Sequence, residues 1–89
     1  MTIRYSRRAL LQLASLYDYL RERNPAAADN VGASIARTIA RLQELPLLGK
    51  QTDEADVRVI IDPEYLYRVF YRVERREIMV IRILHQSQV

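Results

Sequence analysis

The sequence predicts an α+β domain in which a helical hairpin packs on one face of a small antiparallel sheet. Between Arg7 and Leu45, apolar residues recur at spacings of three and four, which is typical of amphipathic helices. After Val57, apolar and polar residues alternate, which is typical of strands with one buried face. A short alternating run at the N-terminus completes the expected element order, β-α-α-β-β-β.

The first expected elements are a strand over residues 2–5 and a helix over residues 7–23, with Ser6 as the helix N-cap. Basic residues followed by leucines also resemble a signal peptide, but Gln12 and Ser15 interrupt the apolar run and no small-residue cleavage site follows. No apolar run approaches the roughly 20 residues that span a bilayer. We therefore expect a cytoplasmic protein without membrane contact.

A second helix is expected to begin at Pro25, because Asn24 is a good N-cap and proline suits the first helical position. Gly32 lies within it and would allow a close approach of the two helices. Pro46 ends the helix, so the two helices should form an antiparallel hairpin. One stripe of the second helix is apolar and consists of Val31, Ile35, Ile39, Leu42 and Leu45.

The rest of the chain predicts a polar loop over residues 50–56 and three strands, over residues 57–61, 65–73 and 78–84. Strict alternation would place Leu66, Arg68, Phe70 and Arg72 on one face, opposite Tyr65, Tyr67, Val69, Tyr71 and Val73. In the last strand it would place Ile78, Val80, Arg82 and Leu84 opposite Met79, Ile81, Ile83 and His85. The helices can cover one side only, so an uncovered side rich in arginine and apolar groups is expected.

That uncovered side has the composition of a binding surface. Thirteen of the fourteen basic residues are arginine, which binds carboxylates and phosphates in a bidentate manner. Residues 51–64 carry five acidic groups and one basic group, whereas residues 65–89 carry five basic and two acidic groups. This skew indicates an anionic partner. The alternative is that long arginine stems simply shield a weakly buried face.

Size and composition limit the chemistry. The 89 residues suit a single domain, residues 1–89, with a modest core, and a partner chain could contribute to its stability. The absence of cysteine excludes disulfides, thiolate metal sites and cysteine nucleophiles, and we expect no metal and no cofactor. His85 is the one side chain suited to proton transfer near neutral pH, although a lone histidine is more often structural. The acidic run Asp53, Glu54 and Asp56 lacks the spacing of a calcium loop.

Several stretches taken together resemble the ParE branch of the RelE/ParE superfamily of bacterial toxins. They are NPAAADNV, LPLLGK, VRVI, YLYRVFYRV and IMVIRILHQ, and they cover nearly the whole chain. The resemblance implies a toxin of a type II toxin–antitoxin operon, in the group linked to plasmid stabilization and growth inhibition. It also implies a hetero-oligomer with a cognate antitoxin, which wraps an extended, partly helical and often acidic segment over the toxin.

The superfamily holds two activities, and the resemblance bears on both. RelE-like members cut mRNA on the ribosome, whereas ParE-like members poison DNA gyrase. Arg68 matches an arginine of the RelE-like enzymes, and Arg58 stands where they have a lysine. Ile60 and Gln86 replace two further basic residues, and the late catalytic tyrosine has no counterpart up to Val89. A related branch with a Glu/Arg/His set keeps Arg68 and His85, with Glu44 as the nearest glutamate.

The leading interpretation is therefore a non-enzymatic toxin that inhibits DNA gyrase by protein–protein contact. One alternative is a ribosome-dependent mRNA endonuclease that uses Arg58, Arg68, Arg82 and His85. Another is a degenerate toxin that retains only antitoxin binding. The candidate residues for contact with the antitoxin or the target are Arg58, Leu66, Arg68, Phe70, Arg72, Arg82 and His85.

Overall fold

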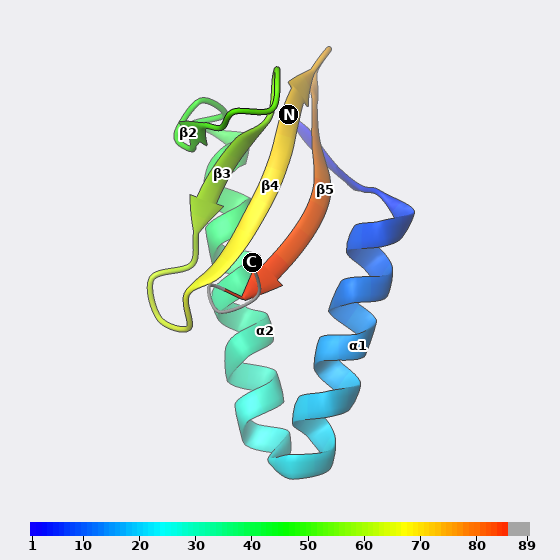
Figure 1. Ribbon diagram of the computed structural model, residues 1–89. Coiled ribbons are helices and arrows are strands. Elements are labelled where there is room, and N and C mark those ends of the chain that lie inside the picture. Colours follow the sequence, from blue (N-terminus) through cyan, green and yellow to red (C-terminus); the bar gives the residue numbers. More distant parts are fainter. Residues whose placement is uncertain (86–89) are drawn as a thin grey trace.

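The computed structural model describes residues 1–85 as two helices and a five-stranded sheet (Figure 1). Both helices lie on the same side of the sheet, as the sequence predicts. A short 3₁₀ turn, Arg41–Gln43, extends the second helix. The elements are β1 (Thr2–Tyr5), α1 (Arg7–Arg23), α2 (Pro25–Ala40), β2 (Lys50–Gln51), β3 (Arg58–Ile61), β4 (Tyr67–Glu74) and β5 (Glu77–His85).

The strands lie in the order β1-β5-β4-β3-β2. The pairs β2–β3, β3–β4 and β4–β5 are antiparallel, but β1 runs parallel to β5. The sheet is therefore mixed, which corrects the expectation of a purely antiparallel sheet. Parallel neighbours need a long connection, and here the whole intervening chain supplies it. The predicted loop over residues 50–56 is also corrected, because Lys50 and Gln51 pair with β3 as a short edge strand.

Side-chain caps fix the helix ends where the sequence predicts them. Ser6 Oγ accepts a hydrogen bond from the Ala9 N–H at 3.0 Å and starts α1. Asn24 Oδ1 accepts from the Ala27 N–H at 3.2 Å and starts α2. The regular helix ends at Ala40, so Leu45, which was predicted in the buried stripe, lies beyond it with 55% of its surface exposed.

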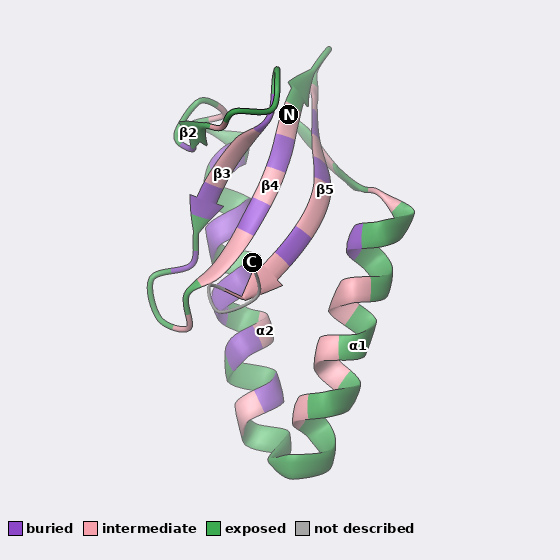
Figure 2. Cartoon of the chain, in the orientation of Figure 1, coloured by how far each residue is buried: buried purple, intermediate pink, exposed green. Residues whose placement is uncertain are grey.

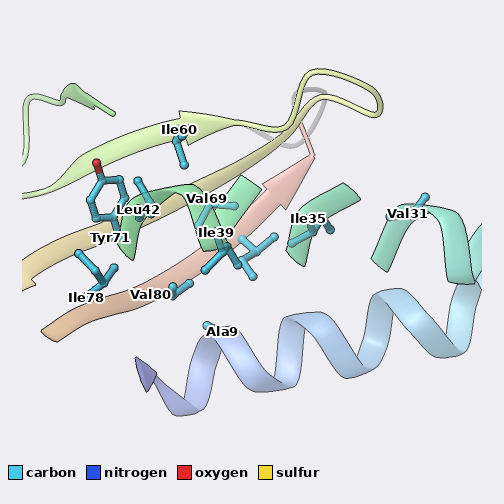
Figure 3. Close-up of a cluster of buried hydrophobic side chains, with 11 residues drawn as sticks. Ala9, Val31, Ile35, Ile39, Leu42, Ile60, Val69, Tyr71, Ile78 and Val80 are labelled. Atoms are coloured by element: carbon cyan, nitrogen blue, oxygen red, sulfur yellow. The ribbon is translucent and has the colours of Figure 1, made fainter. Parts of the chain in front are cut away.

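The core fills the space between the sheet and the helices (Figures 2 and 3). Gly32 of α2 leaves the space that the Tyr17 ring of α1 occupies, since a Cβ there would collide with the Tyr17 hydroxyl. The buried cluster consists of Ala9, Val31, Ile35, Ile39, Leu42, Ile60, Val69, Tyr71, Ile78, Val80 and Ile83. No helix within residues 1–85 is long and apolar enough to cross a membrane.

A buried carboxylate, Asp62, ties α2 to the turn between β3 and β4. It accepts a hydrogen bond from Ser34 Oγ of α2. It also accepts from the Glu64 N–H at 3.2 Å and the Tyr65 N–H at 3.1 Å. These bonds hold the turn between β3 and β4, so β4 starts at Tyr67 and not at residue 65 as the sequence predicts. They compensate the cost of burying a charge, because the carboxylate oxygens are hydrogen-bonded.

Candidate functional site

The side of the sheet that the helices leave uncovered forms a continuous surface, which we call the open face. Its side chains stand in three cross-strand rows, and all are half-buried or exposed. The rows are Val59–Phe70–Arg82, Ile61–Arg68–Leu84 and Arg72–Met79. The open face thus combines three arginines with aliphatic and aromatic groups, as the composition of the strands predicts.

A β-bulge in β5 brings Arg82 to the open face. Tyr71 pairs with Val80, but the preceding residue of β4, Phe70, pairs with Arg82, so Ile81 is the extra residue. As a result, Ile78, Val80 and Ile83 are all buried, and Arg82 and Leu84 turn away from the core. The prediction that Ile78, Val80, Arg82 and Leu84 share a face is therefore wrong. Strict alternation assumes a regular ladder, and the bulge shifts it by one residue.

Arg82 is held in place by two neighbours on this surface. Its guanidinium carbon lies 4.1 Å from the centroid of the Phe70 ring, which is a cation–π arrangement. Its Nη1 atom lies 3.1 Å from Oε2 of Glu54, which comes from the loop after β2. The Arg82 side chain is only 22% exposed. An acidic loop therefore already supplies one carboxylate to the open face, a contact that the sequence does not indicate.

Arg68 and Arg72 differ from Arg82, because within residues 1–85 neither makes an ion pair or a side-chain hydrogen bond. Both lie on β4 in the middle of the sheet, next to apolar neighbours. A hollow of about 680 Å³ adjoins Arg72, between the end of β4 and the loop after β2. Two guanidinium groups with unused donors beside apolar side chains can receive carboxylates or phosphates from a partner.

Three other predicted candidates do not lie on the open face. Arg58 pairs in register with the buried Tyr71, and its Nη1 donates to the Gly49 carbonyl at 2.8 Å and the Leu47 carbonyl at 3.3 Å. It therefore fixes the loop after α2. Leu66 lies in the turn before β4 with a φ of 64°. His85 packs edge-on against the Tyr67 ring, with centroids 4.9 Å apart, on the helix side of the sheet.

The four residues predicted for an mRNA endonuclease therefore lie on two different sides of the sheet. Arg68 and Arg82 share the open face, whereas Arg58 and His85 lie on the other side of the sheet. Glu44 is exposed and follows the 3₁₀ turn. Gln86 lies outside the described residues. Among residues 1–85, no group of three or more His, Cys, Asp or Glu side chains could hold a metal ion.

Tyr67, the ring that packs against His85, lies on the helix side of the sheet. Burial, followed by the nearby Asp62 carboxylate and Tyr19, raises the pKa of Tyr67 above its usual value. The Tyr67 hydroxyl therefore stays protonated near neutral pH and is unsuited to act as a general base there. The open face can bind a partner through guanidinium donors and apolar contact.

Comparison with known protein families identifies the family of this chain. The family described as "ParE toxin of type II toxin-antitoxin system, parDE" matches residues 3–89. The chain belongs to the ParE toxin family. A curated protein of Sinorhizobium fredii named as a candidate toxin, Y4kP, is 28% identical over 86 residues, covering 97% of this chain and 88% of the relative.

Solved structures of the superfamily share the fold of this ParE-family chain. A chain of the chromosomal ParDE toxin–antitoxin system of P. aeruginosa superimposes with a TM-score of 0.83 at 23% identity, covering 96% of this chain and 95% of the other. A chain of the intact E. coli RelBE toxin–antitoxin complex gives a TM-score of 0.67 at 19% identity, covering 94% of each chain. The sequence-based expectation of a RelE/ParE-like fold is thus confirmed.

Proposed function

We propose that this ParE-family toxin acts in the cytoplasm by inhibiting DNA gyrase through protein–protein contact, and that a cognate antitoxin neutralises it. The observation that carries the proposal is the open face, where Arg68 and Arg72 stand beside Phe70 without partners in the described chain. Such a surface offers recognition groups and no assembled catalytic group. Family membership makes gyrase the target to test first.

The geometry favours this function over mRNA cleavage. Cleavage at a 2′-hydroxyl needs charge stabilisation of one phosphate and proton transfer at the same place. The four residues of that alternative would have to act together, but His85 and Arg58 lie on the helix side of the sheet while Arg68 and Arg82 lie on the open face. A phosphate on the open face would meet arginines and no histidine.

The open face also suits the antitoxin. An acidic segment could pair its carboxylates with Arg68 and Arg72 and place apolar side chains against Phe70 and Ile61. Two of the similar solved structures are of toxin–antitoxin systems, in keeping with a hetero-oligomer of this chain with an antitoxin. The anionic partner expected from the charge distribution would then be a protein.

The test uses purified toxin, freed of antitoxin, with gyrase, ATP and relaxed or supercoiled plasmid. We expect loss of supercoiling and accumulation of linear DNA, and we expect the antitoxin to relieve both. An Arg68→Ala variant tests the open face. An Arg75→Ala variant, which is changed in the exposed β4–β5 turn, serves as its matched control. Undisturbed gyrase activity from a folded, antitoxin-binding toxin would reject gyrase as the target.

The same preparations separate the remaining alternatives. Cleavage of mRNA on purified ribosomes, lost in His85→Ala, would identify an endonuclease. Binding of antitoxin without growth arrest on induction, together with inactivity in both assays, would identify a degenerate toxin. Each result differs from the one expected of a gyrase inhibitor.

A further inference from the structure

The turn between α2 and β2 exposes three leucines close together. The Leu48 N–H donates to the Leu45 carbonyl at 3.0 Å, which closes a β-turn with Pro46 at its second position. Leu45, Leu47 and Leu48 are 55%, 64% and 40% exposed. We call residues 45–48 the leucine turn. A single exposed leucine is ordinary, but three of them in one turn form an apolar surface that the core does not use.

The rest of the fold holds this turn in place. The buried Tyr71 hydroxyl donates to the Pro46 carbonyl at 2.8 Å and accepts from the Gly49 N–H at 2.9 Å. Arg58 Nη1 donates to the Leu47 carbonyl at 3.3 Å and to the Gly49 carbonyl at 2.8 Å. A Cβ at Gly49 would lie 2.7 Å from the Tyr71 ring, so this close approach needs glycine. A core tyrosine and a strand arginine therefore fix the turn, while its leucines stay exposed.

A fixed apolar turn is well suited to bind another protein. Ordering a flexible loop costs binding free energy, and a turn held by four hydrogen bonds avoids much of that cost. Leu47 also lines the hollow of about 680 Å³ that adjoins Arg72, together with the apolar residues Ala55, Val57 and Val73. The apolar surface thus continues from the leucine turn through this hollow to the edge of the open face.

The charge beside the leucine turn differs from the charge of the open face. Three carboxylates line the hollow, and they belong to Glu54, Asp56 and Glu74. Two arginines also line it, Arg72 and Arg58, and Arg58 is bonded to the turn. An acidic antitoxin segment would be repelled by these carboxylates, and two copies of the turn facing each other would bring the same carboxylates together. A partner with basic side chains around an apolar pocket would complement them.

We propose that the leucine turn is a contact surface for gyrase, in which Leu47 enters an apolar pocket that basic side chains surround. The identity of the target rests on the proposed function, whereas the site and the chemistry of its partner rest on the turn and the hollow. The antitoxin is expected at the arginines of the open face. A change in the leucine turn should therefore weaken the action on the target and spare the antitoxin complex.

The test compares Leu47→Ala with Leu10→Ala. Both leucines are more than half exposed, but Leu10 does not line the hollow. For each variant we would measure the toxin concentration that halves gyrase supercoiling, and the dissociation constant for antitoxin by calorimetry. We expect that concentration to rise about ten-fold for Leu47→Ala and less than about two-fold for Leu10→Ala. Antitoxin affinity should change less than about two-fold in both variants, which also shows that they fold.

Reversing one charge at the hollow tests the chemistry of the partner. Glu74→Lys places a positive charge there, and Glu22→Lys places one at an exposed position of α1 as the control. We expect Glu74→Lys to weaken gyrase inhibition about three-fold or more at low salt and less at high salt, because screening reduces the repulsion. Glu22→Lys should act like wild type. Inhibition by Glu74→Lys that equals or exceeds that of wild type would reject a basic partner surface.

The other outcomes separate this proposal from the proposed function. Wild-type toxin that leaves gyrase undisturbed would reject gyrase as the target. Wild-type toxin that inhibits gyrase, with equal inhibition by Leu47→Ala, would keep the target and reject the leucine turn. Loss of antitoxin affinity in Leu47→Ala would assign the turn to the antitoxin instead. A wild-type dimer that Leu47→Ala dissociates in sedimentation would assign it to a second copy of the chain, and either result would overturn the proposal.

Discussion

Arg82 packs on Phe70 in the adjacent strand, with its guanidinium carbon 4.1 Å from the centroid of the ring. Phe70 and Arg82 are also register partners, and the bulge in β5 is what makes them so. Because Phe70 supports the guanidinium from one side, its donors are directed toward Glu54 and toward solvent. The open face therefore contains one arginine, Arg82, that is already paired with a carboxylate of the same chain, Glu54. Within residues 1–85, Arg68 and Arg72 have no such carboxylate.

The Glu54 carboxylate should compete with the acidic antitoxin for Arg82. In Glu54→Gln the Arg82 guanidinium loses its ion pair and becomes free for a carboxylate of the antitoxin. An exposed ion pair of this kind stabilises by about 0.2–1 kcal/mol, so we expect antitoxin affinity to rise by about 1.5- to 5-fold. Calorimetry at two salt concentrations checks this, with Asp53→Gln as the control. A weaker complex would mean that Glu54 itself contacts the antitoxin.

Removing an arginine from the open face should weaken the complex with the antitoxin. We expect Arg68→Ala and Arg82→Ala each to cost about 2–5 kcal/mol of binding free energy, because these guanidinium groups would be desolvated against carboxylates. The exposed turn residue Arg75 provides the control, Arg75→Ala, which should change little. Unchanged affinity in both open-face variants would show that these arginines only shield the sheet.

Asp62 should be important for stability rather than for binding. In Asp62→Asn an amide N–H₂ replaces one oxygen of a fully buried carboxylate that faces several N–H donors. We expect the free energy of unfolding to fall by about 2–4 kcal/mol. Ser34→Ala removes one donor and should cost about 1–2 kcal/mol. Urea denaturation measures both, and Asp53→Asn in the exposed loop should stay close to wild type.

Tyr71 should make the fold sensitive to high pH. Burial raises the pKa of its hydroxyl above 10.0, although the Gly49 N–H and Arg58 oppose the rise. Between pH 10 and the folded-state pKa the unfolded chain releases the proton first, so this contribution to stability is complete below pH 10 and is lost as the pH rises further. Burial raises the pKa of Tyr5 and Tyr67 in the same direction.

The Tyr71→Phe variant separates the effect of the Tyr71 hydroxyl on stability at high pH from the packing of the Tyr71 ring. The hydroxyl donates to the Pro46 carbonyl at 2.8 Å and accepts from the Gly49 N–H at 2.9 Å. Its loss should cost about 1–3 kcal/mol at neutral pH and should flatten the decline of stability above pH 10. Tyr19→Phe, at an exposed position, is the matched control. A decline as steep as that of wild type would assign the alkaline sensitivity to other tyrosines.

Local signals in the sequence were sufficient to predict the helices and strands whose apolar residues recur with a regular period. The helix over residues 7–23 is predicted to its last residue, because Ser6 and Asn24 are capping residues whose effect is local. The surface of β4 is predicted as well, since Arg68, Phe70 and Arg72 follow strict alternation. The buried Tyr71 on the opposite side confirms this alternation.

The sequence by itself determined the two helices, every strand except the short β2, the family and the arginine-rich character of one side of the sheet. These follow from local periodicity, caps and motifs, which need no distant partner. The tertiary structure alone decided that Arg82 packs on Phe70, that Arg58 and His85 face the helix side, and that the pairing of β1 with β5 ends at Val80. The places of Arg82, Arg58 and His85 depend on the exact register between neighbouring strands, and the extent of β1 depends on its pairing with β5, which is distant in sequence. A bulge of one residue is enough to move a side chain to the other face.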